Sequence, residues 1–164
     1  MPNLQKIVNK GIKLIQARLK TLSSAAVVRF IEQAYPLCKQ HQALLLMNSA
    51  VDYSVDVDGI HLTSHHLMAL TQRPEHGKWL AASCHNLEQL QHAQNLGVDF
   101  AVLAPVSATS THPGAVSLGW EQFTELVAKV NLPVYALGGM SESSLITARH
   151  SGGQGIAAIR AFLE

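Results

Sequence analysis

The chain has 164 residues, of which 48% are hydrophobic and 14% are charged, and its formal net charge is +1. This length suits one globular domain, residues 1–164, that buries about 70% of the surface exposed by its unfolded chain. The near-neutral charge and the lack of a concentrated basic face exclude a nucleic-acid footprint, and no apolar run approaches the roughly 18 residues of a membrane span. We therefore expect a cytoplasmic protein that binds neither nucleic acid nor membrane.

The first half of the chain alternates helices with short strands. Apolar residues at helical spacing predict the helices, and alternating or continuous apolar runs predict the strands. A serine, Ser23 or Ser24, can cap the second helix. The expected elements are a helix over 1–10, a strand over 11–20, a helix over 23–40, a strand over 43–48, a brief helix over 51–55 and a strand over 59–62.

The second half repeats this alternation with clearer boundaries. Asn86 can cap a helix that Gly97 ends, and Ser141 can cap the last helix. The expected elements are a strand over 79–83, a helix over 86–96, a strand over 99–104, a helix over 120–130, a strand over 133–137, a helix over 141–150 and a strand over 155–159. The chain thus carries about seven strands, nearly all followed by a helix.

Polar residues or glycines end almost every expected strand. Alternating strands and helices favour a parallel sheet, either open and doubly wound or closed as a barrel. A barrel gathers all its strand ends around one mouth, which accounts for this distribution. We therefore predict an α/β fold of the TIM (β/α)8-barrel type with about seven parallel strands. The strand-end residues are Gln16, Arg18, Lys20, Asn48, His61, Ser83, Thr109, Thr111, Gly138, Gly139 and Gly153.

A long loop of Ser, Thr, Pro and Gly follows the apolar run over 100–104. Thr109, Ser110, Thr111 and His112 offer hydroxyl and imidazole groups there. An ordinary solvated connection has the same composition, so the loop alone does not decide between a ligand site and a linker.

Seven short patterns, taken together in order and spacing, resemble the thiamine phosphate synthase/TenI family from about residue 4 to the C-terminus. They are Gln16-Ala-Arg18-Leu-Lys20, Asn48-Ser49, Gly59-Ile-His61-Leu-Thr63-Ser64-His65-His66, Ser83, Thr109-Ser-Thr111-His112, Ala136-Leu-Gly138-Gly139-Met140 and Gly155-Ile-Ala-Ala-Ile159.

The resemblance implies a barrel that joins hydroxymethylpyrimidine diphosphate to a thiazole phosphate, with Mg²⁺ and basic residues steadying the leaving diphosphate. It places Gln16, Arg18, Lys20 and Asn48 on the diphosphate side. It places Thr109, Thr111, Gly138, Gly139 and the backbone near Ile159 on the thiazole phosphate. Arg160 stands where the family has a small residue, so its guanidinium can pair with the anion or fill the pocket.

The chain departs from the family pattern at the metal. The two aspartates that ligate Mg²⁺ correspond to Ser49 and His66, and the loop lysine corresponds to His112. Mg²⁺ prefers oxygen ligands with carboxylate charge, which a hydroxyl and an imidazole do not supply. Pro105 replaces the TenI histidine, so neither activity has its full residue set, and only Ser83 and His112 are left as weak catalytic candidates.

Structural interpretations compete with these functional ones. Arg18 and Lys20 could form salt bridges at the rim, and Gly138-Gly139 could simply make a tight turn. We expect His61 to be a hydrogen-bonded barrel histidine.

A metal site built on histidine or cysteine is disfavoured. The histidines His65, His66, His85 and His112 sit on expected loops with no carboxylate or cysteine spaced to join them. Cys38 and Cys84 match no metal or redox spacing, so we expect two buried free thiols and no cofactor.

Three functions stay open. The first is a thiamine phosphate synthase-like barrel that keeps a phosphate-ligand pocket and has lost or altered the synthase reaction. The second is an active synthase whose Mg²⁺ is held mainly by the substrate diphosphate. The third is a non-catalytic ligand-sensing or interaction domain attached to a Nudix hydrolase.

The family has a strand ahead of its Gln-x-Arg-x-Lys strand, and one short helix precedes that motif here. We therefore expect a barrel that is incomplete at its N-terminus. It should be open between the strand of Gln16 and the strand over 155–159, or closed by another chain such as a second copy.

Overall fold

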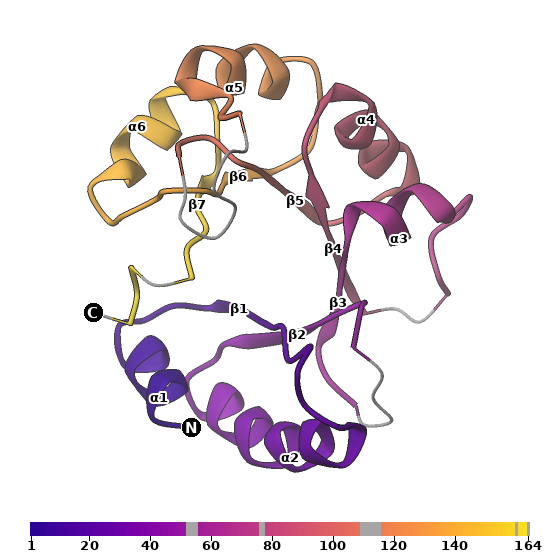
Figure 1. Ribbon diagram of the computed structural model, residues 1–164, viewed down its shortest axis with the longest axis vertical. Helices are drawn as coiled ribbons and strands as arrows, with labels where there is room; N and C mark the ends of the chain where they lie inside the picture. The colour runs from indigo at the N-terminus through magenta and orange to yellow at the C-terminus, as the bar shows by residue number, and fades with distance from the viewer. Residues whose placement is uncertain (52–55, 76–77, 109–115, 160, 164) are drawn as a thin grey trace.

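The computed structural model describes residues 1–51, 56–75, 78–108, 116–159 and 161–163. Seven parallel strands form one sheet in chain order, and the helices lie outside it (Figure 1). The strands are β1 (Leu14–Ala17), β2 (Leu44–Asn48), β3 (Gly59–Leu62), β4 (Trp79–Cys84), β5 (Phe100–Leu103), β6 (Val134–Ala136) and β7 (Gly155–Ile156). The helices are α1 (Pro2–Asn9), α2 (Ser24–Gln40), α3 (Ser64–Ala69), α4 (Leu87–Leu96), α5 (Gly119–Val127) and α6 (Ser144–His150).

The sheet curls into an incomplete barrel. Each strand pairs with its sequence neighbours, and β1 and β7 form the two ends of the sheet among the described residues. The last segment runs from β7 towards α1, where Lys6 Nζ donates to the Leu163 carbonyl at 3.4 Å (Figure 1). The predicted parallel sheet of seven strands, open between its first and last strands, is confirmed.

Alternate residues of each strand face opposite layers of the core. On β2, Leu45 and Met47 pack with Val27 and Ile31 of α2, whereas Leu46 belongs to a cluster inside the curl. A strand covered on both faces must be apolar throughout, which explains the Leu-Leu-Leu-Met run. Burying each of these side chains contributes roughly 1.5–3 kcal/mol.

The two cysteines belong to this core. Cys38 of α2 and Cys84 of β4 are buried free thiols, as expected. Burial raises the pKa of Cys38 to about 11 and the pKa of Cys84 to about 12. Both side chains are therefore neutral packing groups at physiological pH.

Across the described residues, no helix is long and apolar enough to cross a membrane.

Several element boundaries differ from the predictions. The strand expected over 11–20 ends at Ala17, so Arg18 and Lys20 follow β1 instead of lying on it. The helix expected from Ser141 begins at Ser144, because residues 141–143 form the turn that leads into it. The helix expected over 51–55 falls mostly outside the described residues.

Helix α3 was not predicted from the sequence. It is six residues long, and Thr63 caps it by accepting the His66 amide on its side chain at 3.2 Å. His65 and His66 therefore lie on a helix, and the expectation of a loop there was wrong. Six residues are too few to show a helical apolar period, which is why the pattern did not reveal it.

Candidate ligand site at the carboxyl end of the sheet

A pair of carboxamides links the ends of β1 and β2. Asn48 Nδ2 donates to Gln16 Oε1 at 2.9 Å, and Asn48 Oδ1 accepts the Ala50 amide at 3.1 Å. These two contacts fix which way the Asn48 amide points. Asn48 is buried, whereas Gln16 is exposed. The structure thus brings together two of the four residues expected on the diphosphate side.

The other two residues of that group, Arg18 and Lys20, follow β1 and are exposed. Ala17 pairs with Met47, so Arg18 comes next to Asn48 at the same edge. Neither Arg18 nor Lys20 forms a salt bridge with any described residue, which removes the expected alternative of a rim ion pair for that part of the chain. Within the described residues, no carboxylate neutralises these two charges.

His61 and Ser83 form a second pair, on β3 and β4. His61 Nε2 lies 2.9 Å from Ser83 Oγ, and the Phe100 ring meets the imidazole edge-on with centroids 6.4 Å apart. Burial, together with the nearby positive charge of Arg18, lowers the pKa of His61 to about 4. His61 is thus a buried, neutral, hydrogen-bonded histidine. The tautomer of its imidazole decides whether His61 or Ser83 donates in their hydrogen bond.

Ser49 and His66 form a third pair, where the resemblance implies two metal-ligating aspartates. Ser49 Oγ lies 2.7 Å from His66 Nδ1 and accepts the Thr63 amide at 3.0 Å. The Ser49 amide in turn donates to the His61 carbonyl at 2.9 Å. The two positions, 17 residues apart, therefore face one another across the edge of the sheet.

These residues do not fit Mg²⁺. Two described carboxylates that lie between Ser49 and His66 in the sequence form other contacts. Asp58 accepts a hydrogen bond from the Leu45 amide near the amino end of β2, and Asp56 forms a salt bridge with Lys78 at 2.7 Å. Where the chain is described, no cluster of three His, Cys, Asp or Glu side chains could hold a metal ion. Ser49 and His66 themselves supply no carboxylate charge to such an ion.

The other two described histidines considered for a metal site, His65 and His85, make different contacts. His85 Nδ1 contacts the Ala104 carbonyl at 2.8 Å, and His65 stacks obliquely on His66 with centroids 5.6 Å apart. His112 lies outside the described residues.

A turn of two glycines faces the loop after β5. Gly138 and Gly139 have φ of +98° and +66°, a region that side chains other than glycine rarely adopt. A Cβ at Gly138 would lie 2.9 Å from Pro105 Cα, and one at Gly139 would lie 2.6 Å from the Ala108 carbonyl oxygen. The backbone conformation and the close packing of this turn are thus sufficient to explain both glycines. A phosphate role for their amides stays a prediction.

Other expected phosphate contacts are less well supported. Helix α6 has no side-chain cap, and the Ser141 amide instead donates to Ser144 Oγ at 3.2 Å. The helix whose dipole was expected to favour the anion therefore begins at Ser144, three residues later than predicted. Ile159 is 56% exposed. The remaining predicted contacts, Thr109, Thr111 and Arg160, lie outside the described residues.

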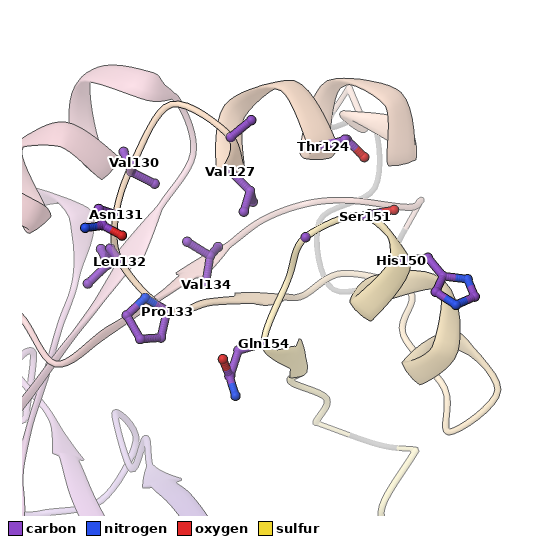
Figure 2. A pocket seen from close by; sticks show the side chains of 12 residues that line it. Thr124, Val127, Val130, Asn131, Leu132, Pro133, Val134, His150, Ser151 and Gln154 are labelled. Carbon is purple, nitrogen blue, oxygen red and sulfur yellow. The ribbon is translucent and has the colours of Figure 1, made fainter.

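Two cavities lie at different ends of the fold. The larger, about 530 Å³, lies between α5, α6 and the residues that enter β6, with Leu132, Pro133 and Gln154 in its wall (Figure 2). This is the amino end of the sheet, which in barrels serves stability. The smaller, about 360 Å³, is lined by Ser49 and His66 and otherwise by apolar side chains. We assign the candidate site to the smaller cavity because the Ser49–His66 pair lines it, although the other two polar pairs do not.

The chain was compared with known proteins. Residues 2–162 match the family described as thiamine monophosphate synthase. The chain is 35% identical over 167 residues to a "Putative thiamine-phosphate synthase 2" of Aquifex aeolicus, covering 100% of this chain and 90% of that protein. It is 29% identical to a thiamine-phosphate synthase of Prochlorococcus marinus, covering 93% of this chain and 45% of that longer protein.

The solved structure of a thiamine phosphate pyrophosphorylase from Pyrococcus furiosus has the same fold. Its TM-score is 0.77 at 22% identity, and the match covers 96% of this chain and 77% of that one. The family match spans nearly the whole chain and agrees with the fold and with the motifs along the carboxyl edge. The chain therefore belongs to the thiamine monophosphate synthase family.

Proposed function

We propose that this chain is a thiamine phosphate synthase/TenI-type barrel of thiamine metabolism that binds a phosphorylated ligand and has lost or altered the synthase reaction. The Asn48–Gln16 pair and the nearby Arg18 and Lys20 support anion binding on the diphosphate side. The Gly138-Gly139 turn supports a second contact, on the thiazole phosphate side.

The Ser49–His66 hydrogen bond is the main observation that supports the proposed loss of synthase activity. In the family reaction the diphosphate leaves with its bonding electrons, and Mg²⁺ supplies charge that stabilises it. The 2.7 Å contact between Ser49 Oγ and His66 Nδ1 joins the two positions expected to hold that ion. Both groups are uncharged when the imidazole is neutral, so neither of these two positions adds an anionic ligand.

A coupled assay with both substrates and Mg²⁺ tests this proposal. We expect the native chain to turn over more slowly than about once per second, and the double variant Ser49→Asp/His66→Asp to be at least about tenfold faster. A native rate of about once per second or more would contradict the loss of activity. Circular dichroism of both proteins controls for folding.

An active synthase is the second candidate. Its support is the 35% identity, over the whole chain, to a relative named as a putative thiamine-phosphate synthase. In that case the substrate diphosphate would hold Mg²⁺ by itself. The native chain would then turn over readily, and the Asp double variant would change the Mg²⁺ concentration needed for half-maximal rate more than the rate itself.

Phosphate binding is tested separately from catalysis. Titration calorimetry with a thiazole phosphate should give measurable heat at millimolar ligand or below. Arg18→Gln should lower the affinity for an anion on the diphosphate side and leave the affinity for the thiazole phosphate nearly unchanged. An absence of heat for every phosphorylated ligand would remove the ligand pocket from the proposal.

A further inference from the structure

We infer that Ser49 and His66 form part of an anion subsite that works without a divalent metal. The inference deepens the proposed function and rests on it, because it assigns the chemistry of the diphosphate side. One free hydrogen-bond donor of the pair would replace two metal-ligating acceptors. The subsite would then take a phosphate or diphosphate group directly, as an uncomplexed anion.

The hydrogen bonds of Ser49 leave one donor of the pair unused. The Thr63 amide can only donate, so Ser49 Oγ accepts that bond at 3.0 Å. If the serine hydroxyl donates to His66 Nδ1, the neutral imidazole carries its proton on Nε2. If His66 Nδ1 donates instead, the serine hydroxyl keeps its hydrogen free. In both arrangements, one N–H or O–H has no acceptor among the described residues.

The pair is partly exposed to solvent and lies in the wall of a cavity. Ser49 and His66 are both half-buried, and both line the cavity of about 360 Å³. A fully buried pair could not meet a ligand, and a fully exposed pair would not be held in place. The Thr63 amide and the 2.7 Å contact hold this pair in a single geometry.

Positive charge lies at the same edge. Asn48 and His61 are register partners on β2 and β3, and Ser49 follows Asn48 directly. Arg18 lies beside Asn48 on the next strand, and its charge reaches His61 strongly enough to contribute to the lowered pKa of that residue. A guanidinium therefore lies at the same edge of the sheet as the pair, and its positive charge favours an anion at that edge.

Two aspartates would have the opposite effect. Carboxylates only accept hydrogen bonds when ionised, so they repel a bare phosphate and need a cation between them and the ligand. A hydroxyl and an imidazole need no such cation. The substitution at these two positions thus changes the preferred form of the ligand from a magnesium complex to the free anion.

Titration calorimetry with inorganic pyrophosphate tests this subsite. We expect the native chain to bind pyrophosphate in EDTA, and excess Mg²⁺ to leave the affinity unchanged or to weaken it because Mg²⁺ complexes the ligand. The Ser49→Asp/His66→Asp variant should lose at least about tenfold in EDTA and regain affinity when Mg²⁺ is added. His65→Asp is the matched control, since it adds a negative charge on the same helix and removes a ring contact with His66 but neither hydrogen bond of Ser49, and it should change affinity much less.

The single variants Ser49→Ala and His66→Gln give a second test that does not depend on the double variant folding. Each should weaken pyrophosphate binding in EDTA by several fold to about tenfold, with an unchanged circular dichroism spectrum. No binding by the native chain in EDTA, or binding that requires Mg²⁺, would overturn the inference. A chain that binds the thiazole phosphate but not pyrophosphate would overturn it while leaving the proposed function intact. Rapid Mg²⁺-dependent synthesis together with metal-free pyrophosphate binding would overturn only the proposed function.

Discussion

The carboxyl edge of the sheet has two halves that are built in different ways. Along β1 to β4, polar side chains contact one another in the Asn48–Gln16 and His61–Ser83 pairs. Between β5 and β6, the described contacts are backbone to backbone, as where the Ser107 amide donates to the Gly138 carbonyl at 3.1 Å. A side-chain contact can change its chemistry by one substitution, whereas a backbone contact of this kind changes only if the loop moves.

This difference fits the departure from the resembled pattern at the two expected metal positions. Ser49 and His66 lie in the side-chain half, where a hydroxyl and an imidazole replace carboxylates and still form a compact pair. In the backbone half, Gly138 and Gly139 keep the resembled sequence, and the space around them admits no side chain. Substitutions in the two halves should therefore change the free energy of unfolding by different amounts and for different reasons.

The largest expected effect is on the backbone half. Gly138→Val would place a Cβ 2.9 Å from Pro105 Cα on a backbone with φ of +98°. We expect the free energy of unfolding to fall by about 3 kcal/mol, from the left-handed conformation and the overpacking together. Urea unfolding followed by circular dichroism measures the change.

Gly97→Val is the matched control for this prediction. Gly97 has φ of +74°, but nothing lies within 4 Å of a Cβ built there, so only the backbone term of about 1 kcal/mol should appear. Equal losses for the two variants would show that the contact with Pro105 is unimportant. By the same reasoning, Gly139→Val would disturb the loop at Ala108 and cannot serve as a clean test of phosphate binding.

A second prediction concerns the pH dependence of the side-chain half. The pKa of His61 is about 4 in the folded protein because of burial, against 6.5 for an unperturbed histidine. Between these values the unfolded chain binds more protons than the folded one, so stability falls as the pH drops from about 6.5 to 4. We expect this group to account for a loss of roughly 3 kcal/mol across that window.

His61→Gln should remove this part of the acid sensitivity. The measurement is the difference between native and variant unfolding free energies at pH 7 and pH 4, with His65→Gln as an exposed histidine control. If native and His61→Gln proteins lose the same stability on acidification, the buried imidazole is not the cause.

Local chemistry in the sequence predicted some elements closely. The strand over Gly59–Leu62 has the predicted bounds, and α4 is capped by the Asn86 side chain and ended by Gly97 in the left-handed conformation, as expected. Caps and left-handed glycines act over one turn of chain, so a single sequence carries the signal. The same holds for the apolar runs that became buried parallel strands.

The contacts at the candidate site could be predicted only in part. The motifs placed Ser49 and His66 near one ligand, but their hydrogen bond depends on the register of β2 against β3 and on a six-residue helix without a visible period. The start of α6 was misplaced because Ser141, Ser143 and Ser144 are equally good local caps. Which serine begins the helix is decided by packing, which the sequence pattern does not contain.

The smallest expected effect separates two pairs within the side-chain half. Ser83→Ala removes the hydroxyl 2.9 Å from His61 Nε2 and leaves a buried ring nitrogen without a partner, which should lower the unfolding free energy by about 1 kcal/mol. Ser49→Ala removes a contact from the half-buried His66 and the acceptor of the Thr63 amide, but water can replace the hydroxyl for both, so its cost should be a few tenths of a kcal/mol. Urea unfolding at pH 7.5 measures both variants, with each protein also titrated with pyrophosphate in EDTA. If Ser83→Ala is silent in stability while Ser49→Ala is costly, then burial does not set the energies of these pairs, and the Ser49–His66 contact is mainly a structural bond.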